Sequence, residues 1–172
     1  RFPGALPHHG SGASPHRGSH GNPDGFLTYA DALERSCNVW PETVAHRLGM
    51  ERLMHWYGLF GLGRPTGIGI PEARGRLHSV EEGTRIQPSA TWFAGIGQGI
   101  GATPIQMANV AATIARDGLW KRPRLVVEGF EYPDASDADT VKLPADPRAF
   151  VEAKRGMRAV IASPGGTGGR AL

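Results

Sequence analysis

Apolar residues recur with helical spacing in the middle of the chain. Positions i, i+3, i+4 and i+7 are occupied by Met50, Leu53, Met54 and Tyr57. This pattern predicts a helix that runs to about Phe60, because such residues share one face of a helix and can be buried together. A second helical piece is predicted from Val39 onward, and Gly49 separates the two pieces.

Polar residues just before the apolar stretches predict where helices begin. Thr28 is expected to cap a short helix over residues 29–35, and Asn38 is expected to cap the piece that starts at Val39. Ser36 to Asn38 are therefore predicted to form a turn between two helices.

The clearest helix is predicted over residues 103–117. Thr103 and Gln106 have the spacing of a capping box, Pro104 occupies the first helical position, and Gly118 follows the last turn. Its expected buried stripe consists of Met107, Val110, Ala111 and Ile114.

Two strands and a last helix are expected in the remainder of the chain. Residues 124–130 and 140–143 are predicted to be strands, and a helix is predicted to open at Asp146 and Pro147. The apolar face of that helix contains Phe150, Ala153, Met157, Val160 and Ile161. Residues 61–90 are rich in turn-forming residues and are expected to be an irregular connection.

The first 25 residues differ in composition from the rest. Residues 1–25 are rich in glycine, proline, histidine and serine, which predicts a flexible loop, and residues 26–172 are expected to form a domain or part of one. A metal could be bound by His8, His9, His16 and His20. No cysteine or paired carboxylate joins them, so a solvated loop is favoured, and we expect no metal and no cofactor.

Composition and charge exclude several classes of function. The formal net charge is +3 and the basic residues are scattered, which does not favour binding to nucleic acid. A single cysteine excludes an internal disulfide and a cysteine-rich zinc site. No stretch approaches the roughly 18 consecutive apolar residues of a membrane-spanning helix.

A glycine-rich turn allows one alternative function. Residues 97–102 (GQGIGA), from Gly97 to Ala102, match the G-x-G-x-x-A pattern of dinucleotide-binding turns, and an apolar stretch over 91–96 precedes them. A dinucleotide-binding oxidoreductase is therefore one alternative, with phosphates at a helix N-terminus. The cap at Thr103 and the lack of further strand–helix units weigh against it.

The triplet Ser36-Cys37-Asn38 can present a hydroxyl and a carboxamide side by side. Serine and asparagine at a helix boundary are usually caps, so the triplet alone does not establish a reactive site. Cys37 is interpreted as structural, because nothing in the sequence suggests a nearby histidine base.

The triplet is one of several stretches that follow each other in a fixed order. They are 29–38 (YADALERSCN), 47–53 (RLGMERL), 60–68 (FGLGRPTGI), 96–99 (IGQG), 103–108 (TPIQMA) and the run 156–167. In combination, over about residues 20–167, they resemble the transpeptidase domain of class B, elongation-type penicillin-binding proteins.

This resemblance implies a fold and a chemistry. The fold would be α+β, a partial serine D,D-peptidase and β-lactamase-like transpeptidase fold, mostly its helical part with few sheet strands. Ser36 would take part in proton transfer to the leaving group, and Asn38 would hydrogen-bond the substrate backbone. In this family the glycines of residues 95–101 form a structural turn.

The resemblance also implies partners and a location. The substrate would be the D-Ala-D-Ala end of a peptidoglycan stem peptide, β-lactams would bind the same site, and a cell-wall synthesis complex would surround it. The protein would act on the extracytoplasmic face of the bacterial cytoplasmic membrane, anchored by a segment outside this chain.

Two of the family's three motifs do not occur in the sequence. The chemistry requires Ser-x-x-Lys and Lys-Thr-Gly besides Ser-x-Asn. No serine here has lysine three residues later, and Gly166 precedes Thr167 where the third motif would have lysine. We therefore expect a fragment that is inactive alone, or, less favoured, a degenerate homologue. A catalytically dead module that binds muropeptide or penicillin is a second alternative, and a serine β-lactamase is disfavoured by residues 96–118.

Overall fold

The computed structural model describes residues 6–7, 26–79, 86–125 and 139–169. The helices are α1 (Tyr29–Glu34), α2 (Val39–Leu48), α3 (Met50–Leu59), α4 (Pro88–Gly95), α5 (Pro104–Ala115) and α6 (Pro147–Ala162). The strands are β1 (Leu6–Pro7), β2 (Phe26–Leu27), β3 (Leu119–Lys121) and β4 (Thr140–Lys142). In these residues no helix is long and apolar enough to cross a membrane.

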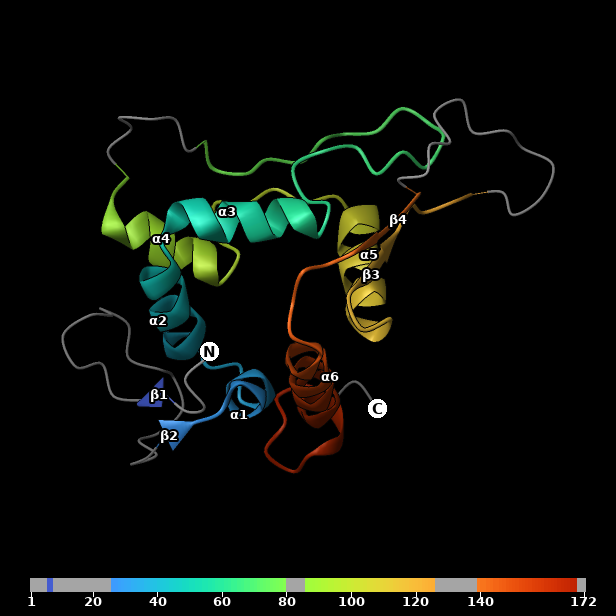
Figure 1. Cartoon of the computed structure of the whole chain (residues 1–172). Helices are drawn as coiled ribbons and strands as arrows, with labels where there is room; N and C mark the ends of the chain where they lie inside the picture. The colour runs from blue at the N-terminus through green and yellow to red at the C-terminus, as the bar shows by residue number, and fades with distance from the viewer. Residues whose placement is uncertain (1–5, 8–25, 80–85, 126–138, 170–172) are drawn as a thin grey trace.

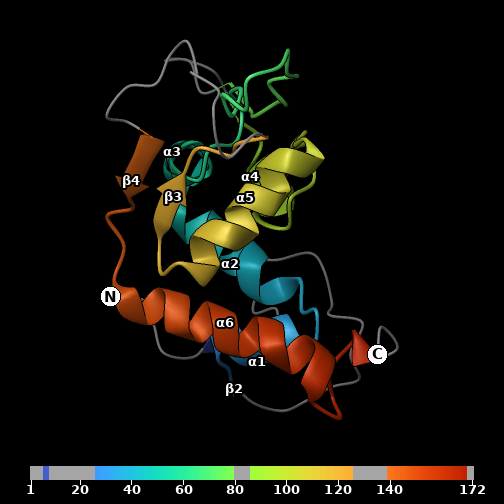
Figure 2. The same cartoon turned by 90° about the vertical axis from the view of Figure 1, so that its right-hand side faces the viewer.

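The helices form three neighbouring groups (Figure 1). Helix α2 packs against α3 and α4, α5 packs against β3, and α1 lies along α6. Figure 2 shows the same arrangement from the side, with α6 lying across one end of the molecule next to α1. Two small antiparallel sheets complete the described part, β1 with β2 and β3 with β4.

Helix α1 begins where the sequence predicts. The Asp31 amide donates to Thr28 Oγ1 over 3.3 Å, and the Thr28 amide donates to Asp31 Oδ2 over 2.9 Å, which completes a capping box. The Thr28 hydroxyl also donates to this carboxylate over 2.6 Å, and this is the main reason that the pKa of Asp31 lies below its ordinary value. The cap predicted from Thr28 is confirmed.

Helix α5 also has its predicted capping box, but the predicted buried face is wrong. The Gln106 amide donates to Thr103 Oγ1, and the Thr103 amide donates to Gln106 Oε1. Met107 is 51% exposed, whereas Gln106 is only 1% exposed. The other residues that this helix buries are Asn109 and Thr113. Of the predicted stripe, Met107 and Ala111 are exposed, whereas Val110 and Ile114 are partly buried.

The buried polar face of α5 forms hydrogen bonds with the irregular segment over residues 61–79. Gln106 Nε2 donates to the carbonyl oxygens of Arg64 (2.7 Å) and Arg74 (2.9 Å). A backbone bridge between Arg76 and Gly101 adds two further hydrogen bonds. The predicted irregular connection is therefore correct over residues 61–79, and α5 determines its path.

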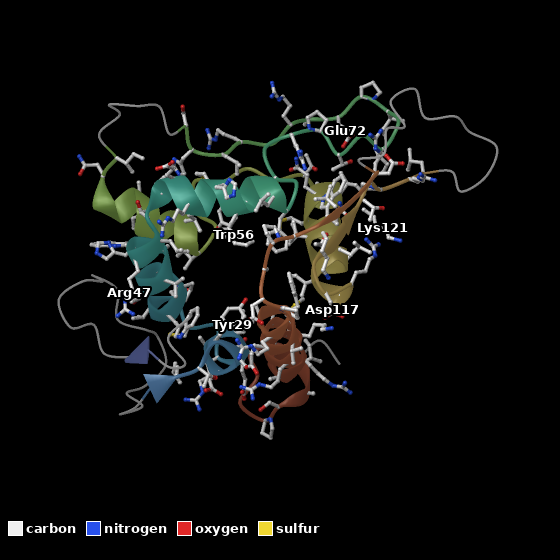
Figure 3. All side chains as sticks on the ribbon, in the orientation of Figure 1. Tyr29, Arg47, Trp56, Glu72, Asp117 and Lys121 are labelled. Carbon is white, nitrogen blue, oxygen red and sulfur yellow. The ribbon has the colours of Figure 1, made fainter. Side chains whose placement is uncertain are left out.

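Glu72 fixes the loop at the far end of this connection. Its carboxylate accepts hydrogen bonds from Thr66 Oγ1 and from the amides of Thr66, Gly67 and Ile68. Burial favours the neutral carboxyl group, but these hydrogen bonds together outweigh burial and lower the pKa of Glu72. Figure 3 shows Glu72 in the segment that passes over α5.

Two further sequence predictions need correction. Helix α4 was not predicted: residues 88–90 lie in the expected irregular connection, and the apolar stretch over 91–96 supplies most of the rest of this helix. The strand expected at 124–130 is not seen at residues 124–125, and residues 126–130 lie outside the described part. The strand that pairs with β4 is β3, which follows α5 directly, with Trp120 opposite Val141.

Helix α6 buries Phe150 and Ala153 as predicted, but Met157 is 44% exposed. Gly156 is buried instead, against α1. A Cβ atom at Gly156 would lie 3.0 Å from Ala30 Cα and 2.8 Å from Leu33 Cδ1. The two helices therefore approach closely at this glycine.

Candidate active site

Ser36, Cys37 and Asn38 form the turn between α1 and α2. The Cys37 amide donates to the Ala32 carbonyl (2.8 Å), and the Ser36 amide donates to the Leu33 carbonyl (3.0 Å). This pair of hydrogen bonds is the Schellman motif, which normally carries glycine at the position of Ser36, because the backbone there is left-handed.

Ser36 adopts that left-handed conformation, with φ of 52°. An L-residue other than glycine pays about 1–2 kcal/mol for it. Non-glycine residues held in such conformations cluster at functional sites. Glycine would end the helix here without the strain, so helix termination alone does not account for a serine at this position. The hydroxyl group is what distinguishes serine from glycine in this turn.

The middle residue of the triplet points inward and its neighbours face outward. Cys37 is 3% exposed and packs with Leu27 and Trp40, while Ser36 and Asn38 are both exposed. The Trp40 indole donates to the Leu27 carbonyl (3.2 Å) and ties β2 to this cluster. The interpretation of Cys37 as a structural residue agrees with this packing.

Asn38 occupies the N-cap position of α2 but does not cap the helix with its side chain. Its backbone is helical, with φ of −76° and ψ of −33°, and its side chain makes no capping hydrogen bond. Within the described residues the Asn38 carboxamide is therefore not committed to the helix, and it lies exposed beside Ser36.

The structure adds Thr167, which sequence reasoning did not connect to the triplet. Its Oγ1 lies 2.6 Å from Ser36 Oγ, within hydrogen-bonding distance, across 131 positions of sequence. The Thr167 amide donates to the Glu34 carbonyl (3.2 Å), and Ser163 Oγ donates to Glu34 Oε1. The sequence indicated this segment only through the local run Gly166-Thr167-Gly168, and that run does not indicate which residue Thr167 contacts.

The described residues were compared with the ligand sets that hold metal ions. No group of three or more histidine, cysteine, aspartate or glutamate side chains is placed to hold a metal among them. His46 and His55 are exposed and each lies beside a tryptophan ring, Trp92 and Trp56 respectively. The histidines of the N-terminal tract lie outside the described residues.

The dinucleotide-binding alternative is contradicted by the geometry. It requires a strand before the glycine-rich turn, and that position is occupied by helix α4. Gly97 and Gly99 have positive φ and connect α4 to α5 as a helix–helix turn.

A mostly helical α+β chain with a Ser-x-Asn turn between two helices is the arrangement expected for part of a serine D,D-peptidase fold. The comparisons agree with this class: residues 8–171 match the family model described as penicillin binding protein transpeptidase domain. The chain belongs to this family.

Known relatives place the chain within the family. It is 32% identical over 156 residues to the peptidoglycan D,D-transpeptidase MrdA of Escherichia coli K12, covering 83% of this chain and 24% of MrdA. Penicillin-binding protein PbpB of Mycolicibacterium smegmatis is 37% identical over 95 residues, which cover 54% of this chain and 14% of PbpB. The chain thus spans about a quarter or less of these relatives, and the predicted class B resemblance is confirmed.

Solved structures confirm the predicted partial transpeptidase fold. The crystal structure of Pseudomonas aeruginosa PBP2 in complex with WCK 5153 superposes with a TM-score of 0.79 at 29% identity, covering 98% of this chain and 38% of that chain. The apo transpeptidase domain of Burkholderia pseudomallei penicillin-binding protein 3 shares the fold, with a TM-score of 0.71 at 23% identity over 86% of this chain and 42% of that chain.

Proposed function

We propose that residues 26–172 form part of a peptidoglycan D,D-transpeptidase domain and that Ser36 and Asn38 belong to its active site. Membership of the transpeptidase family and the likeness to MrdA support this reaction class.

The reaction is acyl transfer through a serine ester. A nucleophilic serine attacks the carbonyl carbon between the two terminal D-alanines, the C–N bond breaks, and the released amine takes up a proton. An amine of a second stem peptide then attacks the ester and restores the serine. In the first step Ser36 would pass the proton to the leaving amine, and Asn38 would hydrogen-bond the backbone of the bound peptide.

The observation that carries this proposal is the conformation of Ser36. A left-handed serine whose hydroxyl is exposed at the protein surface and bonded to Thr167 is explained by a need for that hydroxyl. The exposed Asn38 carboxamide beside it, not used as a helix cap, supplies the group expected to bind a peptide.

The nucleophile is proposed to lie outside these 172 residues. None of the serines in the sequence is followed by lysine at the third position, and Lys-Thr-Gly does not occur. The chain alone is therefore expected to form no acyl-enzyme. The same absence favours a second candidate, a module that binds muropeptide or penicillin without turnover.

Labelling with a fluorescent penicillin tests both candidates. The 172-residue chain should give no covalent band, whereas the protein expressed from the complete coding sequence should give one. In the latter protein Ser36→Ala should slow labelling at least tenfold, a loss of about 1.4 kcal/mol or more in transition-state stabilisation. Ser89→Ala, at an exposed serine of α4, is the matched control and should label at the parent rate.

The outcomes separate the candidates. A protein of complete coding sequence that binds penicillin reversibly, without a covalent band, would support the non-catalytic module. A covalent band on the 172-residue chain would show that the nucleophile lies within these residues, contrary to the proposal.

The partners and location follow from the same proposal. The substrate would carry a D-Ala-D-Ala terminus, β-lactams would compete with it, and the domain would work outside the cytoplasm within a cell-wall synthesis complex. Protection of the intact domain from labelling by a D-Ala-D-Ala peptide, but not by its L-Ala-L-Ala counterpart, would test the substrate.

A further inference from the structure

We infer that the turn after α6, residues 163–168, is a positioning element for Ser36 and that Thr167 is the residue in it that fixes the Ser36 hydroxyl. This inference rests on the proposed function of Ser36. It assigns a role to a segment that contains none of the family's three motifs.

The first observation is the contact itself. Ser36 Oγ and Thr167 Oγ1 are 2.6 Å apart, a normal distance for a hydroxyl–hydroxyl bond. A second acceptor for the Thr167 hydroxyl is the Glu34 carbonyl oxygen at 3.4 Å, which is beyond the usual range of about 2.5–3.0 Å. The Thr167 hydroxyl therefore interacts mainly with Ser36.

The second observation is that the backbone of Thr167 is itself fastened to α1. Its amide donates to the Glu34 carbonyl over 3.2 Å. That carbonyl belongs to the last turn of α1, where no helical donor remains. The bond thus satisfies a carbonyl at the helix end and places Thr167 beside Ser36, two residues after Glu34.

The turn reaches α1 a second time through side chains. Ser163 Oγ donates to Glu34 Oε1, and the Gly166 amide donates to the Ser163 carbonyl over 2.9 Å. A Cβ atom at Gly166 would collide with the carbonyl oxygens of Ala159 and Val160. The close return of the chain onto α6 therefore requires glycine directly before Thr167.

Helix α1 depends on α6 for its place. It has six residues, too few to be a stable helix alone. It lies next to α6 (Figures 1 and 2). Gly156 of α6 packs against Ala30 and Leu33 of α1. Helix α6 and the turn that follows it thus set the position of both the backbone and the hydroxyl of Ser36.

Fixing the hydroxyl matters for proton transfer. The backbone of Ser36 determines where its Cβ lies, but rotation about χ1 leaves three staggered positions for Oγ. The bond to Thr167 selects one of them. Thr167 is therefore a positioning residue that acts through Ser36, and we do not expect it to touch the substrate.

The test is a double-mutant cycle in the protein expressed from the complete coding sequence, measured as the rate of acylation by a fluorescent penicillin. Thr167→Val keeps the shape of the side chain and removes its hydroxyl, and we expect about a 5- to 10-fold slower rate. Thr167→Ser keeps the hydroxyl and should stay within about twofold of the parent. In the Ser36→Ala background, Thr167→Val should have no further effect.

Each result decides the matter. An unchanged rate for Thr167→Val, or an equal slowing in both backgrounds, overturns the positioning role while Ser36 keeps its proposed function. A parent rate for Ser36→Ala, or a parent protein that is not acylated at all, overturns the proposed function and this inference with it. Thermal unfolding of each variant separates a slower reaction from loss of folded protein.

Discussion

Gly156 is the residue at which the packing of α1 on α6 can be tested most directly. The change Gly156→Ala adds a single methyl group in the interior of α6. That methyl group would lie 2.8 Å from Leu33 Cδ1 and 3.0 Å from both Leu33 Cβ and Ala30 Cα. Carbon atoms in contact are normally about 3.5–4.0 Å apart, so something must move.

The expected free energy has two opposing contributions. Alanine is favoured over glycine inside a helix by about 1 kcal/mol. Overpacking a tight contact costs about 1–3 kcal/mol. Leu33 Cδ1 can rotate away, but Ala30 Cα can move only with α1 itself, so we expect the upper part of this cost. The net result is a loss of about 1–2 kcal/mol, or about 2–8 °C in Tm.

Gly58→Ala is the matched control, because a Cβ atom there meets nothing within 4 Å and the residue also lies in a helix. It should stabilise the protein by about 0.5–1 kcal/mol. Urea unfolding followed by tryptophan fluorescence measures both variants, and Trp40 packs in the cluster next to α1. If Gly156→Ala stabilised the protein as much as Gly58→Ala does, α1 and α6 would not be in contact at this glycine.

Two further changes test the irregular segment over residues 61–79. Gln106→Met removes the donors to the carbonyls of Arg64 and Arg74 and should cost about 2–4 kcal/mol in urea unfolding, whereas Gln98→Met, at an exposed site, should stay within about 0.5 kcal/mol. The lowered pKa of Glu72 means that the unfolded chain, with a pKa near 4.5, binds this proton more readily. The free energy of unfolding should therefore fall as the pH drops below about 4.5, and it should fall less in the Glu72→Gln variant. Identical pH profiles for the parent and the variant would contradict the hydrogen bonds described for this loop.

The helix caps could be predicted from the sequence because they are local. The capping boxes at Thr28 and Thr103 join residues three positions apart, so the pattern contains both partners. Helix α4 could not be predicted in the same way. The apolar run over residues 91–96 is only six residues long, and periodicity does not distinguish a helix from a strand over so short a run.

The buried face of α5 could not be predicted because periodicity shows which side of a helix is apolar, not which side is covered. Gln106 is buried by carbonyl groups 32 and 42 positions away, which no local pattern contains. The contact between Ser36 and Thr167 has the same character: the triplet was recognisable, but its partner becomes visible only when α1 has packed on α6.

The left-handed backbone of Ser36 has a consequence for how this position can change over time. Only glycine, and to a lesser degree asparagine or aspartate, fits the turn without added strain. A lineage released from the need for the hydroxyl would therefore drift toward these residues, with a small gain in stability. The identity of residue 36 across descendants of this gene would then record, at a single codon, whether selection for the reaction continues.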